Sequence, residues 1–259
     1  MDERLIAFER LLNIMDELRE KCPWDQKQTF ETLRNLTIEE TYEMADAITD
    51  KDYTGLKGEL GDLFLHLVFY SKMGQEQGLF DVTSVLNQIC DKLIYRHPHI
   101  YGDTVVKDEE EVKANWEKLK LKEGKKSVLE GVPKSLPALV KATRIQEKVK
   151  GIGFEFEDAE AAWAKVQEEL NELQAEVKQQ SDQQEQEFGD VLFSLVNYAR
   201  FLNISPENAL ALTNQKFIAR FQKMEDLLLK ENLDIKALDL QTMDLYWDKV
   251  KAHEKEKKQ

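Results

Sequence analysis

The chain of 259 residues contains few cysteines and no long apolar run. Its 2 cysteines, Cys22 and Cys90, lie far apart and in no metal-binding spacing, so a disulfide framework is not expected. The sequence contains no stretch of about 18 apolar residues, which is the length needed to span a membrane. The N-terminal segment is charged and lacks the uninterrupted apolar core of a signal peptide. We therefore expect a soluble, cytoplasmic protein that does not associate with membranes.

Positive charge is also scarce relative to negative charge. Lysine and arginine total 36 against 50 acidic residues, which gives a net charge of −14. Such a surface repels nucleic-acid backbones, because binding to them depends on many contacts from lysine and arginine to phosphates. Direct nucleic-acid binding is therefore not expected. A smaller polyanion would need a metal ion or a local basic cluster.

Proline and glycine number only 5 and 11, and they lie between apolar stretches that recur at helical spacing. The first stretch places five apolar residues on one helical face, namely Leu5, Phe8, Leu12, Met15 and Leu18. No segment shows the strict alternation of a half-buried strand. Thr37 with Glu40 fits a capping box, and Ser205 before Pro206 fits a helix start. These patterns predict an all-α chain of about ten helices.

The chain repeats itself in order and at nearly constant separation. The matching segments are 36–48 with 165–177, 59–70 with 187–200, 92–97 with 216–221, and 116–120 with 247–251. Between the copies, residues 122–137 are rich in lysine, glycine and proline and are typical of a linker. We predict a tandem duplication of one helical domain. Its N-terminal copy spans 1–121 and its C-terminal copy spans 138–259.

Each copy carries five acidic residues in the pattern EExxE…ExxD. They are Glu39, Glu40, Glu43, Glu59 and Asp62 in the first copy, and Glu168, Glu169, Glu172, Glu187 and Asp190 in the second. Acids three apart project from one helix face, so packing of the two helices as a hairpin would bring four carboxylates together. Mg²⁺ prefers oxygen ligands and often shares them with substrate phosphates. The pattern therefore predicts a magnesium site in each copy.

Several alternatives remain open at this point. The pattern does not distinguish metal ligands from solvent-facing acids at Glu39 and Glu168, and Glu40 could instead be the capping partner of Thr37. Ferritin-like di-iron proteins are excluded, because no histidine of the chain follows a glutamate by three residues. No phosphate-binding glycine-rich loop occurs either.

A basic pair four residues apart and a later tryptophan follow the acids in both copies. They are Lys92, Arg96 and Trp116 in the first copy, and Lys216, Arg220 and Trp247 in the second. In an acidic protein such a recurring pair indicates a phosphate clamp, although ordinary surface salt bridges would give the same spacing. The tryptophans fit either base stacking or core packing.

These motifs together resemble the MazG family of nucleoside triphosphate pyrophosphohydrolases, in the all-α NTP pyrophosphatase superfamily. The segments that carry the resemblance are CPWDQKQTF, EETYE, GELGDLF and RHPHIYGD in the first half, and EELNEL, EFGDVLF, KFIARF and YWDKVK in the second. The resemblance implies Mg²⁺-dependent hydrolysis of a nucleoside triphosphate to the monophosphate and pyrophosphate. It also implies a homodimer and a house-cleaning role on nucleotide pools.

The resemblance also assigns residues to roles. The metal ligands would be Glu169, Glu172, Glu187 and Asp190, with Glu40, Glu43, Glu59 and Asp62 as their first-copy counterparts. Substrate would be held by Lys165, Lys216, Arg220 and Trp247, with Lys92, Arg96 and Trp116 as counterparts. The catalytic residues would be Glu168, Glu169, Glu172 and Lys165, and whether Glu168 or a metal ligand is the general base stays open.

The two copies differ at one position before the acidic motif. Lys165 stands three residues before Glu168, and the matching position before Glu39 is Leu36. The first copy therefore lacks this lysine, and we predict that the C-terminal site carries most of the activity. The competing hypothesis is a non-enzymatic helical module that senses nucleotides or metals or binds a partner. Against it, the second copy has kept both its acids and its basic pair.

Overall fold

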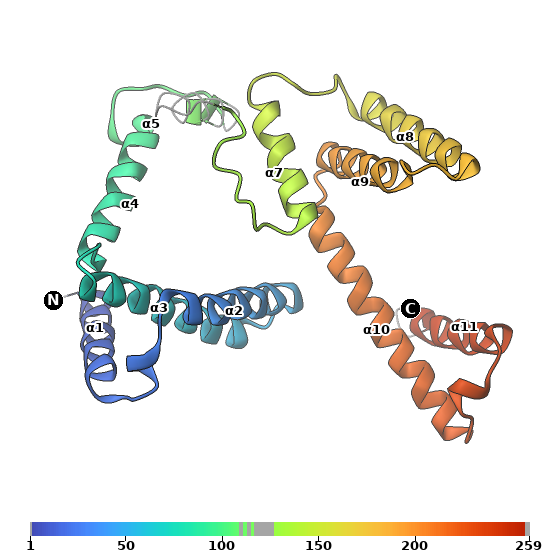
Figure 1. The fold of residues 1–259 in the computed structure, drawn as a ribbon, viewed down its shortest axis with the longest axis horizontal. Coiled ribbons are helices and arrows are strands. Elements are labelled where there is room, and N and C mark those ends of the chain that lie inside the picture. The colour runs from blue at the N-terminus through green and yellow to red at the C-terminus, as the bar shows by residue number, and fades with distance from the viewer. Residues whose placement is uncertain (1, 109–110, 113–114, 117–126, 257–259) are drawn as a thin grey trace. The chain divides into compact units, whose positions relative to one another are not determined.

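A computed structural model describes residues 2–108, 111–112, 115–116 and 127–256, and every regular element in these ranges is a helix (Figure 1). The predicted all-α fold is confirmed. The chain divides into two compact units, Met1–Lys107 and Asp108–Gln259. The domain boundary expected after residue 121 lies outside the described residues. No helix of the described ranges is long and apolar enough to cross a membrane.

The first unit is built around a hairpin of two long helices. Its helices are α1 (Glu3–Lys21), η1 (Asp25–Lys27), α2 (Phe30–Asp50), α3 (Tyr53–Glu76), α4 (Val82–Arg96) and α5 (Pro98–Tyr101). Helices α2 and α3 pack against each other, and α1 packs on α3. Lys51 turns the hairpin with a left-handed backbone at φ 57°, and Asp52 then caps α3 by accepting from the amides of Thr54 and Gly55.

The second unit repeats this hairpin. Its helices are α7 (Ala138–Lys150), α8 (Ala159–Gln179), α9 (Gln184–Phe201), α10 (Pro206–Lys230), η2 (Ile235–Ala237) and α11 (Leu240–Glu256). Helices α8 and α9 form the most extensive helix pair, and Gln180 turns between them at φ 53°, as Lys51 does in the first unit. The predicted duplication is therefore visible in the backbone of the two hairpins.

One of the two predicted helix starts is wrong. Helix α2 begins at Phe30, and its capping box is formed by Thr29 and Thr32. Thr37 lies inside the helix and donates its hydroxyl to the carbonyl oxygen of Leu33. A hydroxyl that bonds four residues back is compatible with a helix interior, so a Ser/Thr-x-x-Glu spacing alone does not mark a start. The start at Ser205 is confirmed, because its side chain accepts from the amide of Asn208.

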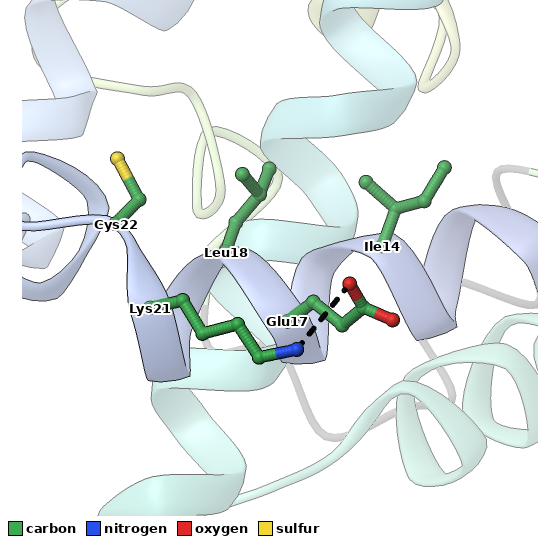
Figure 2. A pocket seen from close by; sticks show the side chains of 5 residues that line it. All are labelled: Ile14, Glu17, Leu18, Lys21 and Cys22. Carbon is green, nitrogen blue, oxygen red and sulfur yellow. Dashed lines mark ion pairs between the residues drawn. The ribbon is translucent and has the colours of Figure 1, made fainter.

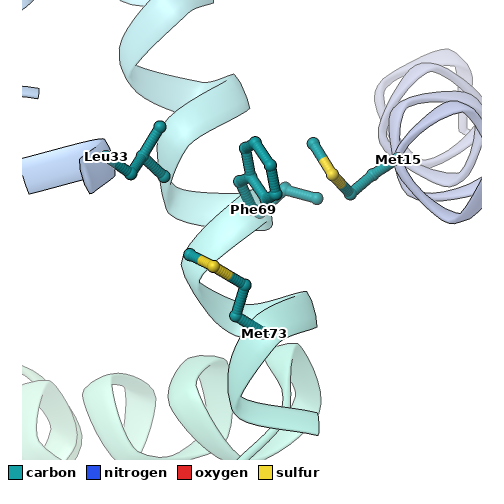
Figure 3. Close-up of a cluster of buried hydrophobic side chains, with 5 residues drawn as sticks. Met15, Leu33, Phe69 and Met73 are labelled. Atoms are coloured by element: carbon teal, nitrogen blue, oxygen red, sulfur yellow. The ribbon is translucent and has the colours of Figure 1, made fainter. Parts of the chain in front are cut away.

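The core of the first unit lies where α1, α2 and α3 meet. Figure 3 shows Met15, Leu33, Phe69 and Met73 pointing toward one another, and Val68 belongs to the same buried cluster. Met15 is 1% exposed, whereas Leu5, on the same predicted face of α1, is 62% exposed. The apolar face predicted for this helix therefore buries its central part and not its first turn.

The second unit has a separate core between α10 and α11, formed by Met224, Leu228, Tyr246 and Val250. Helix α7 is tied to α9 by the side chain of Gln146, whose Nε2 donates to the carbonyl oxygen of Phe193 at 2.8 Å. The described part of the predicted linker lies against α7. The buried ammonium of Lys148 donates to the carbonyl oxygens of Val128 and Glu130 at 3.0 and 3.1 Å.

Replacing Met15 with alanine should lower the free energy of unfolding by about 2–5 kcal/mol, because it removes a fully buried side chain and leaves a cavity. Leu5→Ala on the same helix is the matched control and should cost less than about 1 kcal/mol. Urea denaturation followed by circular dichroism measures both. Equal losses from the two variants would contradict the described core.

Candidate active site

Three carboxylates converge between the two helices of the second hairpin. Glu169 comes from α8, and Glu187 and Asp190 come from the first two turns of α9. One ligand oxygen from each lies within 4.8 Å of the others. The spacing of three residues puts Glu187 and Asp190 on one face of α9, and packing of the hairpin brings that face against α8. Of the four acids that the sequence places here, the structure groups three.

Glu172 is the acid that stays outside this group. Glu172 is exposed, yet the charge of its carboxylate still acts on Glu187. Partial loss of hydration and then the negative charges of Glu172, Asp190 and Glu169 raise the pKa of Glu187 above its usual value. The ionised acids of this hairpin therefore repel one another, and a bound cation would relieve that repulsion.

The first unit forms a similar but not identical group. Glu40 and Glu43 of α2 and Glu59 of α3 place one oxygen each within 4.8 Å of one another. Asp62, the counterpart of Asp190, is exposed and lies outside the group. Partial loss of hydration, followed by contact with Glu59 and the charge of Asp62, raises the pKa of Glu40. Both hairpins thus concentrate negative charge at the same place.

Lys165 is ion-paired within the second unit. Its ammonium lies 2.8 Å from a carboxylate oxygen of Glu169 and 2.9 Å from one of Glu168. Glu169, and then Glu168, hold the pKa of Lys165 above its usual value. Because Glu169 is buried, this nearby positive charge offsets part of the cost of keeping it ionised. The lysine expected to face phosphate therefore also neutralises the acidic group.

The counterpart of Lys165 has a different environment. Leu36 packs against the buried cluster of the first unit, so the same helical position contributes to a core in one copy and to the acidic group in the other. No lysine or arginine among the described residues forms an ion pair with Glu40, Glu43 or Glu59. The two acidic groups therefore differ in net charge as well as in composition.

The structure does not bring the basic pairs to the acids of the same unit. Lys216 and Arg220 lie on α10, whose main contacts are with α11 and α7. The acids lie at the start of α9, a helix of 18 residues that spans about 27 Å before α10 begins. In the first unit, Lys92 and Arg96 lie near the end of α4, which starts only after α3 has ended. Their expected place beside the acids stays a prediction.

The tryptophans have packing roles where the structure describes their contacts. The ring of Trp247 lies 5.0 Å from that of Phe217, in the contact between α11 and α10. This geometry fits core packing, and it leaves the proposed proximity to a nucleotide untested. Trp116 is half-buried and falls within the second unit, whereas Lys92 and Arg96 belong to the first.

Sequence reasoning missed two acids. Glu176 contributes negative charge at Glu187 and accepts a hydrogen bond from the hydroxyl of Ser181. It stands four residues after Glu172, so the helical period that selected Glu169 and Glu172 could have found it. Glu254 on α11 forms ion pairs with Arg220 and Lys223 of α10. No local pattern signals that contact, because it joins two helices.

A pocket elsewhere does not contribute to this site. Figure 2 shows it on α1, lined by Ile14, Glu17, Leu18, Lys21 and Cys22, with an ion pair between Glu17 and Lys21 at 3.6 Å. It contains none of the acids discussed above.

Both cysteines of the chain are free, in agreement with the absence of a disulfide framework.

The carboxylate groups fit magnesium by their donor chemistry. Each offers only oxygen ligands from the described residues, and carboxylates with water and phosphate are the ligands that Mg²⁺ prefers. The raised pKa values of Glu187 and Glu40 also indicate two places where added positive charge is favoured. Glu169, Glu187 and Asp190 are the residues best placed to hold an ion in the second unit.

Comparison with known protein families gives a match in each unit. A family model for the MazG nucleotide pyrophosphohydrolase domain matches residues 28–101 and 157–224. A solved structure of a mazG-related protein from Thermotoga maritima covers 44% of this chain and 98% of its own, with 29% identity and a TM-score of 0.40.

Two relatives match almost the whole chain. The nucleoside triphosphate pyrophosphohydrolase of Escherichia coli K12 is 42% identical over 95% of this chain and 98% of its own length. The nucleoside triphosphate pyrophosphohydrolase/pyrophosphatase MazG of Thermotoga maritima is 43% identical over 97% of this chain and 98% of its own. Since the family matches both hairpins and these relatives extend over nearly all of the sequence, the chain belongs to the MazG family of nucleotide pyrophosphohydrolases.

Proposed function

We propose that this protein is a magnesium-dependent hydrolase that converts a nucleoside triphosphate and water to the monophosphate and pyrophosphate. The observation that carries the proposal is the convergence of carboxylates on each helical hairpin, with ligand oxygens within 4.8 Å of one another. The two near full-length relatives are named nucleoside triphosphate pyrophosphohydrolases, which supports the substrate class. A house-cleaning role in the cytoplasm is part of the same proposal.

The second unit supplies the main site in this proposal. Glu169, Glu187 and Asp190 would hold Mg²⁺, and Glu172, whose charge acts on Glu187, would join them when the ion is bound. The bound ion would polarise the α–β phosphoanhydride and would lower the pKa of a water that it binds. Glu168 lies at the exposed edge of the group, where it or one of the ligands takes the proton from the attacking water.

The positively charged residues hold the triphosphate. Lys165 lies next to the acids, so it is placed to contact a phosphate that shares the ion. Lys216 and Arg220 lie four apart on α10 and bind the outer phosphates of the substrate. Trp247 lies on the neighbouring helix and is proposed to approach the nucleotide. Their counterparts in the first sequence copy are Lys92, Arg96 and Trp116, and that copy has Leu36 at the position of Lys165.

We further propose that the protein works as a homodimer. Each hairpin exposes an apolar stripe at equivalent positions of its second helix, Leu60, Phe64 and Leu67 on α3 and Phe188, Leu192 and Leu195 on α9, and these side chains are 40–59% exposed. Contiguous apolar surface of this kind favours association. A second copy of the chain would cover the stripes and could bring basic pairs to the acids from which they are separated within one unit.

The dimer can be tested with charged residues in the two stripes. Leu192→Glu and Phe64→Glu should each shift sedimentation from a dimer toward the 30.2 kDa monomer, because a carboxylate in an apolar interface is costly to desolvate. Gln186→Glu, at an exposed position of α9, is the control and should leave the dimer intact. Sedimentation of the unmodified protein as a monomer alone would refute this part of the proposal.

The activity can be tested with a panel of nucleoside triphosphates in the presence of Mg²⁺ and after its removal by EDTA. We expect release of pyrophosphate and monophosphate that stops when the metal is chelated. Orthophosphate release would indicate a different phosphohydrolase. A complete lack of turnover across the panel would instead favour the non-enzymatic nucleotide or metal sensor.

The ranking of the two sites can be tested by substitutions at equivalent positions. Glu169→Gln should lower turnover by about 100-fold or more, because it removes both a metal ligand and the partner of Lys165. Glu40→Gln is the matched change in the first unit and should have a smaller effect. Initial rates of pyrophosphate release at saturating Mg²⁺ measure both variants. A greater loss from Glu40→Gln would reverse the assignment of the main site.

A further inference from the structure

The guanidinium of Arg220 is held by a carboxylate on the neighbouring helix. Its Nε donates to Oε2 of Glu254 at 2.8 Å, and both side chains are 25% exposed. The other oxygen of the same carboxylate accepts from the ammonium of Lys223 at 2.8 Å. Glu254 is therefore fixed from both sides by residues of α10.

The contact uses only one of the three nitrogens of Arg220. Neither Nη1 nor Nη2 forms a hydrogen bond with any residue that the structure describes. A guanidinium binds phosphate best through two parallel N–H groups, and the edge between Nη1 and Nη2 provides such a pair. A carboxylate bound to Nε leaves this terminal edge available to an anion.

The carboxylate is itself held in place by packing of α11. Trp247, Val250 and Glu254 stand at steps of three and four, which places them on one face of that helix. Trp247 packs on Phe217, and Val250 lies in the buried cluster between α10 and α11. The hydrophobic contact thus sets the position from which Glu254 reaches Arg220.

We propose that Glu254 is a positioning residue that fixes the guanidinium of Arg220 through Nε, so that its Nη1–Nη2 edge is presented to a substrate phosphate. This inference rests on the proposed function, because it takes Arg220 as a phosphate-binding residue. Orienting a flexible side chain before binding removes part of the entropy cost of binding. Glu254 therefore acts on substrate affinity and not on the chemical step.

The charge of Glu254 is stable at neutral pH. Hydrogen bonds from Lys223 and Arg220 lower its pKa to about 2. Since the carboxylate stays ionised, it offers two acceptor oxygens to the two basic side chains at every pH at which the enzyme is assayed. The contact is therefore a permanent support for Arg220 near neutral pH and does not switch with protonation.

The test compares substitutions of Glu254 in the full-length protein, with ATP as the probe. Glu254→Ala should raise KM about 3- to 10-fold with kcat unchanged within about twofold, because a free arginine must be ordered on binding. Glu254→Gln should stay within about twofold of the wild-type KM, since its amide oxygen still accepts from Nε. Glu254→Asp keeps the charge but is one methylene shorter, so it should behave like the alanine variant.

Two further variants connect the effect to Arg220. Lys223→Ala removes the other partner of Glu254 and should raise KM less than Glu254→Ala does, because the contact of Glu254 with Nε of Arg220 remains. In an Arg220→Ala background, Glu254→Ala should cause no additional change, because the two residues act through one contact. Equilibrium binding of ATP without Mg²⁺ gives a readout independent of turnover, and circular dichroism checks folding. If the alanine variant does not fold, the glutamine and aspartate variants decide the question.

The possible failures are distinguishable. An unchanged or lowered KM for Glu254→Ala would overturn the inference, and a lowered value would mean that Glu254 competes with phosphate. An increase for Glu254→Gln as large as that for Glu254→Ala would also overturn it, because the hydrogen bond to Nε would then be unimportant. If Arg220→Ala itself leaves KM unchanged, the role of Arg220 in the proposed function fails, and the inference fails with it.

Discussion

The packing of two helices in each hairpin forces acidic side chains together against their mutual repulsion. Contacts between α8 and α9, and between α2 and α3, bury apolar side chains and hold the backbone so that one oxygen of each grouped carboxylate lies within 4.8 Å of the others. Loss of hydration first, and then the neighbouring acids, raise the pKa values of Glu187 and Glu40. Hydrophobic packing therefore supplies the free energy needed to concentrate negative charge, and the proposed metal chemistry uses the charge concentrated in this way.

The duplicated hairpins show how one arrangement can diverge without losing its fold. Both turn through a left-handed residue, and both gather three carboxylates. At the position before the acids, Lys165 faces the acidic group while Leu36 joins a core. A single substitution on a helix face can thus move a position from packing to electrostatics. The groups differ in net charge for this reason, which is the physical basis for expecting them to differ in function.

Much of this arrangement could be predicted from the sequence because helical periodicity fixes which residues share a face. It gave the all-α fold and the convergence of acids across each hairpin, and the segments repeated in order gave the duplication. Periodicity does not determine how one helix is rotated against its neighbour. This rotation leaves Glu172 and Asp62 outside the close groups of carboxylates. Periodicity also could not identify the partners of long side chains, so the Glu254 contact was missed and the ion pairs of Lys165 were not expected. The wrong helix start at Thr37 has a similar cause, because a hydroxyl can bond back inside a helix as readily as it can cap one.

The turns of the two hairpins have a consequence for engineering the protein. Lys51 and Gln180 adopt positive φ angles with full side chains, which costs about 1–2 kcal/mol relative to glycine in that conformation. Glycine at these positions would remove the steric cost and add about 0.4–1 kcal/mol of unfolded-state entropy, so the net change favours the folded chain. Neither turn contains an acid of the proposed site. The hairpins could therefore be stabilised at their ends without altering the residues on which the chemistry depends.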